Sequence, residues 1–297
     1  MTLLMDGGMG GELSKRKAGS PDGLWSAQAL LDAPDVVKAV HMDYIAAGAR
    51  IIITNSYSTI PSYLAKAGLE ARFEELTGLA GKIAREAVEE SGEDVLILGS
   101  LPPMDESYRA DLAPPRTYSE PIYQAMVKAL LPYVDGFVCE TLSTAEEGLS
   151  AATAATKCGD CKPVYVSRTL GETPGSGLRS GESVTEAFET VRDLPLAGFL
   201  FNCTHPLAVE DGLKELRALT DKPLGGYANT MTDVPEGWTL DEGFGIARRD
   251  DGNPALYAEA ALRWRKAGAS MIGGCCGTGP AHIAELKRRL DEEKAPQ

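Results

Sequence analysis

Basic residues are scarce in this sequence relative to acidic ones. The chain has 297 residues, with 29 Lys and Arg against 43 Asp and Glu, which gives a formal net charge of −14. No block rich in Lys or Arg interrupts the acidic composition. A polyanionic partner such as a nucleic acid is therefore not expected.

Long apolar runs are also lacking. No segment approaches the roughly 18 consecutive apolar residues typical of a membrane-spanning helix. The opening residues, MTLLMDGG, do not combine a basic region with a long apolar stretch, as a secretory signal would. We therefore expect no association with membranes and a cytoplasmic location.

Histidine is rare and dispersed, which gives little support to a Ser-His-Asp or Cys-His hydrolase. The three histidines are His41, His205 and His282. His41 is expected in a helix between strands, and His282 on the surface or as a cap in the first turn of a helix. His205 is expected to cap or line a loop, with metal binding as the alternative.

What the sequence does contain is a series of eight short apolar runs, at a spacing of about 25 to 45 residues that suits strand-plus-helix units. The runs are residues 3–6, 50–55, 95–101, 136–141, 164–170, 198–203, 223–228 and 269–275. Segments with helical periodicity lie between them, for example 34–48 and 257–268, each ending in Ala-Gly. This pattern predicts an α/β protein with a single (β/α)₈ TIM barrel domain over residues 1–297.

A doubly wound open sheet is the structural competitor. Such a sheet more often shows six or fewer units, or a glycine-rich first turn that binds a dinucleotide. The segment DGGMGGEL at residues 6–13 is rich in glycine but lacks the G-x-G-x-x-G spacing. The barrel is therefore the favoured fold.

Six cysteines are too few for a disulfide scaffold in a chain of this length. Cys203 ends the sixth predicted strand, and Cys275 with Cys276 ends the eighth. Alternate strands of a barrel can bring their carboxyl ends together, and three thiolates can hold Zn²⁺ with a fourth position open. The alternative is that these cysteines are small buried apolar residues.

The other cysteines have plainer expectations. Cys158 and Cys161 form a C-x-x-C pair in KCGDCK, between a helix and the fifth strand and hence at the amino end of the barrel. Because barrel active sites lie at the carboxyl end, we expect a surface loop without a catalytic role, with a structural metal or a disulfide as the alternatives. Cys139 lies within the fourth strand and is expected in the core.

Five segments, in chain order, carry a resemblance to a known family. They are DGGMGGEL, LWSAQALLDAPDVVKAVHMDYIAAGARIIITNSY, FVCET, FNCTHP and GGCCGTGPAHI, and the resemblance extends over residues 3–285. This set resembles the motifs of the homocysteine S-methyltransferase family. The resemblance implies a barrel enzyme in which Cys203, Cys275 and Cys276 bind zinc, and in which the zinc activates homocysteine to accept a methyl group.

The resemblance also implies an amino-acid pocket. Asp6 and Glu140 map onto carboxylates that receive the amino group of homocysteine, and backbone amides near Gly7 and Gly8 would face its carboxylate. Asn202, beside Cys203, is included as a substrate-binding residue. The sequence departs from the family pattern in YANTM at residues 227–231 and in GMGGE at residues 8–12, where the usual motifs are Y-x-N-[SA]-G and G-x-G-T.

The resemblance favours a sulfonium donor, S-methylmethionine or S-adenosylmethionine. The chain lacks the additional C-terminal segment of the betaine-dependent members, and Thr141 rather than an aromatic residue follows Glu140. Betaine, dimethylsulfoniopropionate or a selenol acceptor, and a zinc-binding barrel without activity, remain alternatives. The oligomeric state cannot be predicted from the sequence.

Three segments that follow predicted strands are longer than a barrel requires, namely residues 102–118, 171–182 and 230–253. They are expected at the carboxyl end of the barrel, where they would shape the donor site. Four aromatic residues are candidates for cation–π contact with a sulfonium, with packing as the alternative. They are Trp25, Tyr108, Tyr118 and Trp238.

Overall fold

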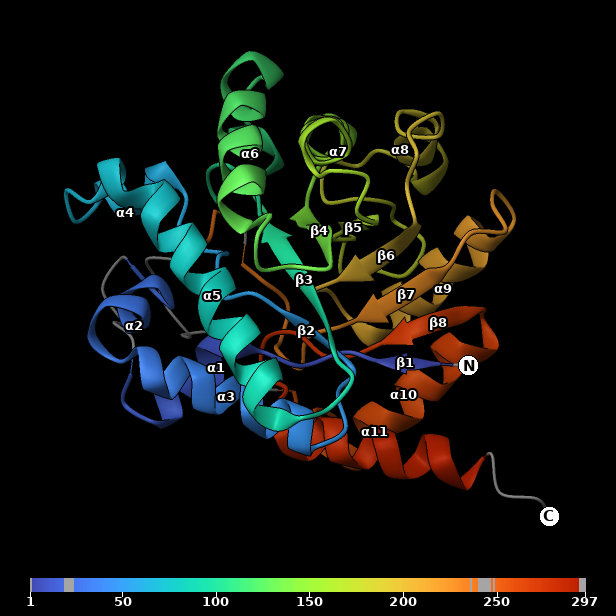
Figure 1. Cartoon of the computed structure of the whole chain (residues 1–297). Coiled ribbons are helices and arrows are strands. Elements are labelled where there is room, and N and C mark those ends of the chain that lie inside the picture. The colour runs from blue at the N-terminus through green and yellow to red at the C-terminus, as the bar shows by residue number, and fades with distance from the viewer. Residues whose placement is uncertain (1, 19–23, 236, 240–246, 248, 294–297) are drawn as a thin grey trace.

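The computed structural model describes residues 2–18, 24–235, 237–239, 247 and 249–293 (Figure 1). Eight parallel strands form one sheet in the order β1-β8-β7-β6-β5-β4-β3-β2. The strands are β1 Leu3–Leu4, β2 Ile51–Ile53, β3 Leu96–Leu101, β4 Gly136–Leu142, β5 Val164–Arg168, β6 Gly198–Asn202, β7 Leu224–Tyr227 and β8 Ala269–Ile272. Each predicted apolar run matches one of these strands, and β4 alone extends beyond its run, by one residue.

The first and second strands close the sheet into a barrel. Met5 and Ile51 form a parallel bridge just beyond β1. The backbone N–H of Asp6 donates to the carbonyl of Ile51 at 2.9 Å, and that of Arg50 donates to the carbonyl of Leu4 at 2.7 Å. The predicted (β/α)₈ barrel is therefore confirmed.

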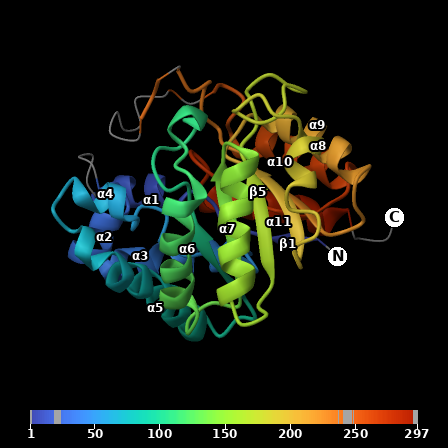
Figure 2. The ribbon, with the colours of Figure 1, turned by 90° about the horizontal axis from the view of Figure 1, so that it is seen from above.

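Helices cover the outside of the sheet (Figures 1 and 2). They are α1 Met9–Lys15, α2 Ala27–Asp32, α3 Pro34–Ala46, α4 Pro61–Ala65, α5 Phe73–Ser91, α6 Arg116–Leu130, α7 Ala145–Cys158, α8 Val184–Glu189, α9 Pro206–Arg217, α10 Pro254–Lys266 and α11 Pro280–Glu292, with short 3₁₀ turns at Glu70–Arg72 and Ala110–Leu112. None of the described helices combines the length and the apolarity that a bilayer crossing needs.

Two helices end slightly earlier than their sequence pattern predicts, and a glycine follows each of them. The predicted segments 34–48 and 257–268 end as helices at Ala46 and Lys266, two residues before the glycine in each case. Gly48 and Gly268 have φ angles of 109° and 102°. Glycine adopts these angles without a clash of Cβ, and this lets the chain turn into the next strand.

The barrel has two apolar layers. Inside the sheet lies one layer of side chains: Met5, Ile51, Leu98, Val138, Leu200, Tyr227 and Met271. A larger cluster fills the space between the strands and the helices, and Phe137, Cys139 and Phe201 belong to it. Because successive residues of a strand point to opposite faces, this division tells which residues at the strand ends face the barrel axis.

Candidate metal centre and active site

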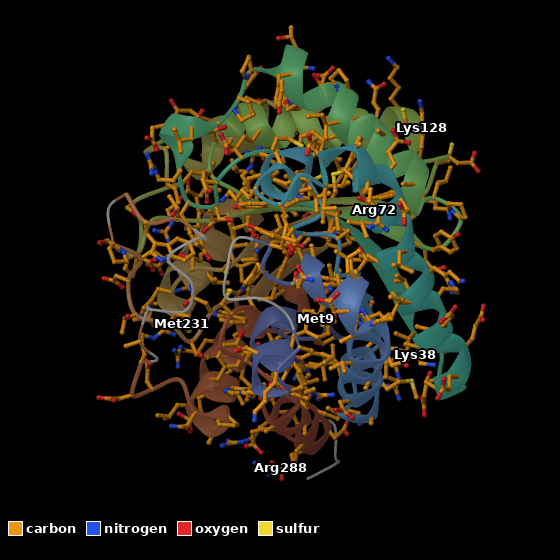
Figure 3. All side chains as sticks on the ribbon, turned by 90° about the vertical axis from the view of Figure 1, so that its left-hand side faces the viewer. Met9, Lys38, Arg72, Lys128, Met231 and Arg288 are labelled. Carbon is orange, nitrogen blue, oxygen red and sulfur yellow. The ribbon has the colours of Figure 1, made fainter. Side chains whose placement is uncertain are left out.

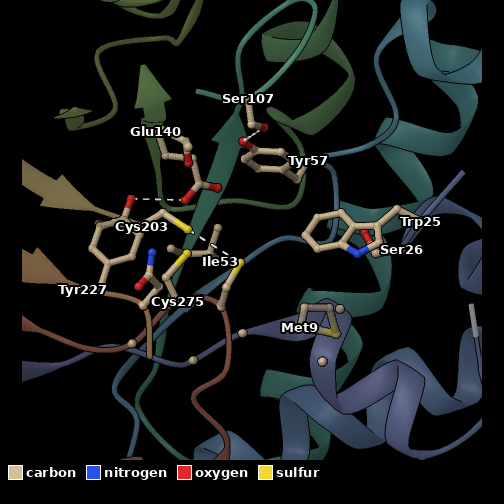
Figure 4. Close-up of a pocket in the computed structure, with 18 of the residues that line it drawn as sticks. Met9, Trp25, Ser26, Ile53, Tyr57, Ser107, Glu140, Cys203, Tyr227 and Cys275 are labelled. Carbon is tan, nitrogen blue, oxygen red and sulfur yellow. Dashed lines mark hydrogen bonds between the residues drawn. The ribbon is translucent and has the colours of Figure 1, made fainter. Parts of the chain in front are cut away.

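Three cysteine sulfurs lie together at the carboxyl end of the barrel. The Sγ atoms of Cys203, Cys275 and Cys276 all lie within 4.8 Å of one another, and those of Cys203 and Cys276 are 3.5 Å apart (Figure 4). All three cysteines are free of disulfides, and the cluster is the one group of three possible metal ligands found among the residues that the structure describes. The convergence expected from the strand order is thus observed.

A break in strand alternation brings Cys203 to the cluster. Leu200 of β6 points into the barrel, whereas Phe201 packs outside it against the helices. Simple alternation would send residue 203 outward as well. Instead Cys203 has a φ angle of 51°, which is uncommon for a residue other than glycine. This left-handed turn redirects the chain, so that the Cys203 sulfur meets those of the eighth strand.

Two glycines carry Cys275 and Cys276 into position. A Cβ atom on Gly273 would lie 2.6 Å from the Cβ of Met5, and one on Gly274 would lie 2.2 Å from Oγ1 of Thr278. Only glycine therefore allows this segment to pass so closely beside Met5 and to fold back against Thr278. The close passage explains why the residues before the cysteine pair are Gly-Gly and not β-branched residues.

Charge within the cluster favours a bound cation. Hydrogen bonds with the Cys275 and Cys276 thiols lower the pKa of Cys203, while hydrogen bonding with Cys203 raises the pKa of Cys275 and the pKa of Cys276. Three sulfur anions at this separation repel one another strongly unless a positive ion lies between them. An all-sulfur set of three ligands suits Zn²⁺, which prefers tetrahedral coordination by nitrogen and sulfur.

Asp6 lies just beyond the first strand, in the wall of a pocket that opens from the sulfur cluster. Its side chain is buried, and its Oδ2 accepts a hydrogen bond from the backbone N–H of Ile53 at 2.9 Å. Burial raises the pKa of Asp6 well above its usual value, and the nearby Glu140 carboxylate adds to this effect. A buried carboxylate that lacks a cationic partner is suited to receive a positively charged group.

Glu140 faces the same pocket from the fourth strand. It shares its side of β4 with Val138, which points into the barrel. The hydroxyl groups of Ser100 and Tyr227 donate to its two carboxylate oxygens, the second at 3.1 Å (Figure 4). Burial nevertheless raises the pKa of Glu140 to about 7. Asp6 and Glu140 thus form a second feature of the pocket, a pair of acids beside the sulfurs.

Gly7 and Gly8 also line the pocket. The N–H of Gly8 donates to Oγ1 of Thr278 at 3.3 Å. A Cβ atom on Gly8 would lie 2.6 Å from the carbonyl oxygen of Cys275. The glycine segment after the first strand is therefore packed directly against the segment that carries the cysteine pair.

Asn202 lies behind the pocket wall and is not among the lining residues. Its Oδ1 accepts hydrogen bonds from the backbone N–H of Thr141 and from the hydroxyl of Ser167, and its Nδ2 donates to Oγ1 of Thr141. Thr141 has a φ angle of 59°. The Asn202 side chain thus supports the turn that follows Glu140.

Aromatic rings form much of the remaining wall. Trp25, Tyr57, Tyr108 and Trp238 line the pocket, together with Met9 and Met231, which Figure 3 labels at the carboxyl end of the barrel. The rings of Trp25 and Tyr57 meet edge to face with centroids 5.9 Å apart. The pocket lining contains no Lys, Arg or His among the described residues. Among the described lining residues, the only ionisable groups besides thiols and phenols are those of Asp6 and Glu140.

Two expectations about this wall were wrong. Tyr118 lies in α6, which begins at Arg116, and its side chain is exposed and does not reach the pocket. The helix begins there because Pro115 occupies the N-cap position. The segment 171–182 supplies none of the lining residues. Its Arg179 instead lies behind the wall, over the ring of Tyr108.

Sequence analysis missed Tyr57 and Tyr227. The Tyr57 hydroxyl pairs with that of Ser107 at 2.6 Å, and the Tyr227 hydroxyl bonds to Glu140 (Figure 4). Tyr227 is the last residue of a strand, and Tyr57 follows the second strand by four positions. Their places after strands are the signal that would have singled them out.

The histidines have structural roles. His205 is the N-cap of α9, where its Nδ1 accepts from the N–H of Leu207 at 3.2 Å, so the expected cap is confirmed. His282 caps α11 through Gly279 at 3.1 Å and is buried, not on the surface. His41 is buried in α3. Its imidazole makes no hydrogen bond to any residue that the structure describes, and burial lowers its pKa to about 4.

The remaining cysteines lie where they were expected. Cys139 is fully buried in β4. Cys158 is the last residue of α7, and Cys161 is exposed in the turn that leads to β5. Neither Cys158 nor Cys161 lines the pocket, which lies at the other end of the barrel.

Known proteins share both this fold and its sequence. The family model described as homocysteine S-methyltransferase matches residues 3–290. Homocysteine S-methyltransferase of Escherichia coli strain K12 is 32% identical over 308 residues, covering 97% of this chain and 94% of that protein. Selenocysteine methyltransferase of Astragalus bisulcatus is 28% identical, covering 98% of this chain and 93% of that protein.

A solved structure agrees with these matches. The metallated form of the homocysteine methyltransferase MmuM from Escherichia coli superposes with a TM-score of 0.81 at 31% identity, and the match covers 97% of this chain and 96% of that one. The family match extends over nearly the whole barrel and includes both segments that supply the three sulfurs. The chain belongs to the homocysteine S-methyltransferase family.

Proposed function

We propose that this protein transfers a methyl group from a sulfonium donor to the sulfur of homocysteine. A new bond forms between the homocysteine sulfur and the methyl carbon, and the bond from that carbon to the donor sulfur breaks. The products are methionine and a neutral thioether. The single observation that carries the proposal is the cluster of three cysteine sulfurs at the base of a pocket that also holds two buried acids.

Cys203, Cys275 and Cys276 would hold the zinc ion that the family implies. Zinc bound there supplies a fourth position at which the homocysteine thiol binds as a thiolate at neutral pH. Without such help, a thiol with a pKa near about 8.5 is only slightly ionised at neutral pH and is a poor nucleophile.

Asp6 and Glu140 would bind the amino group of homocysteine. Both acids are buried and face one pocket without a basic side chain among its described lining residues, so an ammonium group supplies the missing positive charge. The backbone amides near Gly7 and Gly8 would receive the carboxylate, with the N–H of Gly8 exchanging its bond to Oγ1 of Thr278 for one to the ligand. This assignment gives the acceptor a fixed orientation before the methyl group arrives.

The aromatic wall supports a cationic donor. Trp25, Tyr57 and Trp238 present rings to a pocket whose described lining residues include two acids and no base, and a sulfonium is attracted both to aromatic rings and to carboxylates. Because the leaving thioether departs without charge, the reaction needs no general acid. The structural roles of all three histidines are consistent with such a reaction.

The test measures zinc content and methionine formation in the purified protein. We expect bound zinc, and turnover of homocysteine with S-methylmethionine or S-adenosylmethionine. Removal of zinc with a chelator should abolish turnover, and added zinc should restore it. Dimethylsulfoniopropionate, betaine and a selenol acceptor complete the panel. Full activity without metal, or activity with betaine alone, would contradict the proposal.

A further inference from the structure

One tyrosine of the pocket wall touches the sulfur cluster directly. The hydroxyl of Tyr108 lies 2.8 Å from Sγ of Cys203. A metal-bound thiolate has no proton to donate, so in the zinc-loaded protein this hydrogen bond must run from the tyrosine hydroxyl to the sulfur. Among the described tyrosines of the pocket, Tyr108 bonds to a sulfur of the cluster, whereas the hydroxyls of Tyr57 and Tyr227 bond to Ser107 and Glu140.

The ring of Tyr108 is held by residues of two other loops. The guanidinium carbon of Arg179 lies 4.8 Å from the ring centroid, and the Trp238 ring lies 5.7 Å away, tilted by 48°. Tyr108 itself has a φ angle of 66°, a conformation that costs free energy in a residue other than glycine. Its surroundings therefore hold the residue in an orientation that it would not adopt alone.

Arg179 is in turn fixed by its own loop. It pairs with Glu172, and both side chains are largely buried, with exposed fractions of 11% and 16%. Arg109, the residue after Tyr108, donates to the carbonyl of Gly237 at 3.2 Å, which joins the Tyr108 loop to the loop of Trp238. The loops that follow β3, β5 and β7 thus meet around one phenol ring.

We propose that Tyr108 is a positioning residue for the metal centre: its hydroxyl donates a hydrogen bond to the Cys203 thiolate, and Arg179 holds the ring in the orientation that this bond requires. The inference rests on the proposed zinc site and adds a function for the segment 171–182, which does not line the pocket. Arg179 also covers one face of the Tyr108 ring. We therefore expect Tyr108 to contact the metal ligand Cys203, and the other aromatic rings of the pocket to contact the sulfonium donor.

The physical effect follows from the charge on sulfur. A hydrogen bond from the Tyr108 hydroxyl to Sγ of Cys203 fixes the direction in which this sulfur points and offsets part of its negative charge, so the sulfur is held ready to bind zinc. Groups that hydrogen-bond to metal ligands typically change metal affinity by about 10-fold to 100-fold when they are removed. Tyr108→Phe keeps the ring and removes only the hydroxyl, which makes it the appropriate variant.

The experiment measures zinc affinity by competition with a chromophoric chelator, and the thiolate-to-metal absorption band of the Co²⁺-substituted protein. We expect Tyr108→Phe to weaken zinc binding about tenfold and to shift the Co²⁺ band. Tyr118→Phe is the matched control, because Tyr118 is exposed on α6, and it should change neither quantity. Equal zinc affinity in Tyr108→Phe and in the wild type would overturn the inference.

A double-mutant cycle tests the role of Arg179. Arg179→Gln should weaken zinc binding about threefold to tenfold in the wild type and by less than about twofold in the Tyr108→Phe background. An equal loss in both backgrounds would overturn the role of Arg179 as a support for this hydrogen bond. Wild-type protein that binds no zinc would instead refute the proposed function, and the inference with it.

Discussion

Cysteines lie at both ends of this barrel, and the two groups differ in sequence spacing, in exposure and in how closely their sulfurs approach one another. At the amino end, Cys158 and Cys161 are close in sequence, but Cys161 is exposed in a turn and Cys158 ends a helix. At the carboxyl end, residues more than seventy positions apart bring three sulfurs within 4.8 Å. The comparison teaches that converging strand ends, and not a compact motif, make the candidate site.

The largest difference between the two ends should appear when a sulfur of the trio is removed. Cys276→Ala leaves two thiolates and solvent, which is a weak zinc site. We expect the loss of most bound zinc and at least about a 100-fold loss of methyl transfer. Elemental analysis of the purified variant and an assay of methionine formation measure the two effects. If this variant kept its full zinc content, Cys276 would not be a zinc ligand and the metal would bind at another site.

The acids beside the sulfurs should show the next largest effect. Glu140→Gln removes one of the two charges assigned to the homocysteine amino group, and a hydrogen bond to a charged group is worth about 1.5–3 kcal/mol. We expect kcat/KM for homocysteine to fall about 10-fold to 100-fold while the zinc content stays unchanged. A variant that lost its zinc instead would show that Glu140 serves the metal and not the amino acid.

The same substitution should stabilise the fold at alkaline pH. Burial raises the pKa of Glu140 from 4.5 to about 7, so the folded state binds a proton more tightly than the unfolded state. The contribution of this group to stability is therefore fully present below about pH 4.5 and is lost as the pH rises through about 7. Glu140→Gln should raise the free energy of unfolding by up to about 3 kcal/mol at pH 8 and by little at pH 4.

Urea unfolding of the zinc-free protein at the two pH values measures this difference. The Glu89→Gln variant, which changes an exposed acid on α5, is a suitable comparison. A Glu140→Gln variant whose gain in stability is equal at both pH values would contradict the assignment of the raised pKa to Glu140.

A smaller effect is expected from the residue behind the wall. Asn202→Ala leaves the buried N–H of Thr141 without its acceptor, which costs about 1–3 kcal/mol. We expect a lower free energy of unfolding and a modest rise in the KM for homocysteine, because the turn after Glu140 loses its support. If KM rises as steeply as in Glu140→Gln and stability is unchanged, Asn202 contacts the substrate directly.

The smallest effect should come from the amino end. The double variant Cys158→Ser, Cys161→Ser should keep its zinc content and its turnover within about twofold, because neither residue lines the pocket. Metal analysis and the methionine assay apply here as well. An inactive or zinc-free double variant would show that the cysteines at the amino end, and not only those at the carboxyl end, are needed for zinc binding or catalysis.

Much of this site could be predicted from the sequence, because the order of the strands in a barrel determines which strand ends lie close together. The three cysteines were predicted from their places at strand ends, and Asp6 and Glu140 from the family resemblance; the structure brings all five to one pocket. Tyr118 was misplaced, because a residue count cannot tell where a long loop becomes a helix. The functional roles of the two acids remain predictions until the variants are measured.

The sequence by itself determined the eight-unit barrel, through the regular alternation of apolar runs and amphipathic segments, and it identified the cysteines whose strands would converge. Only the tertiary structure decided that Asn202 supports a turn, that Arg179 lies over Tyr108, and that Cys203 turns inward against the alternation of its strand. The reason is physical. Periodicity records which face of an element is buried, whereas side-chain partners depend on loop conformations and backbone angles set by contacts far apart in the chain.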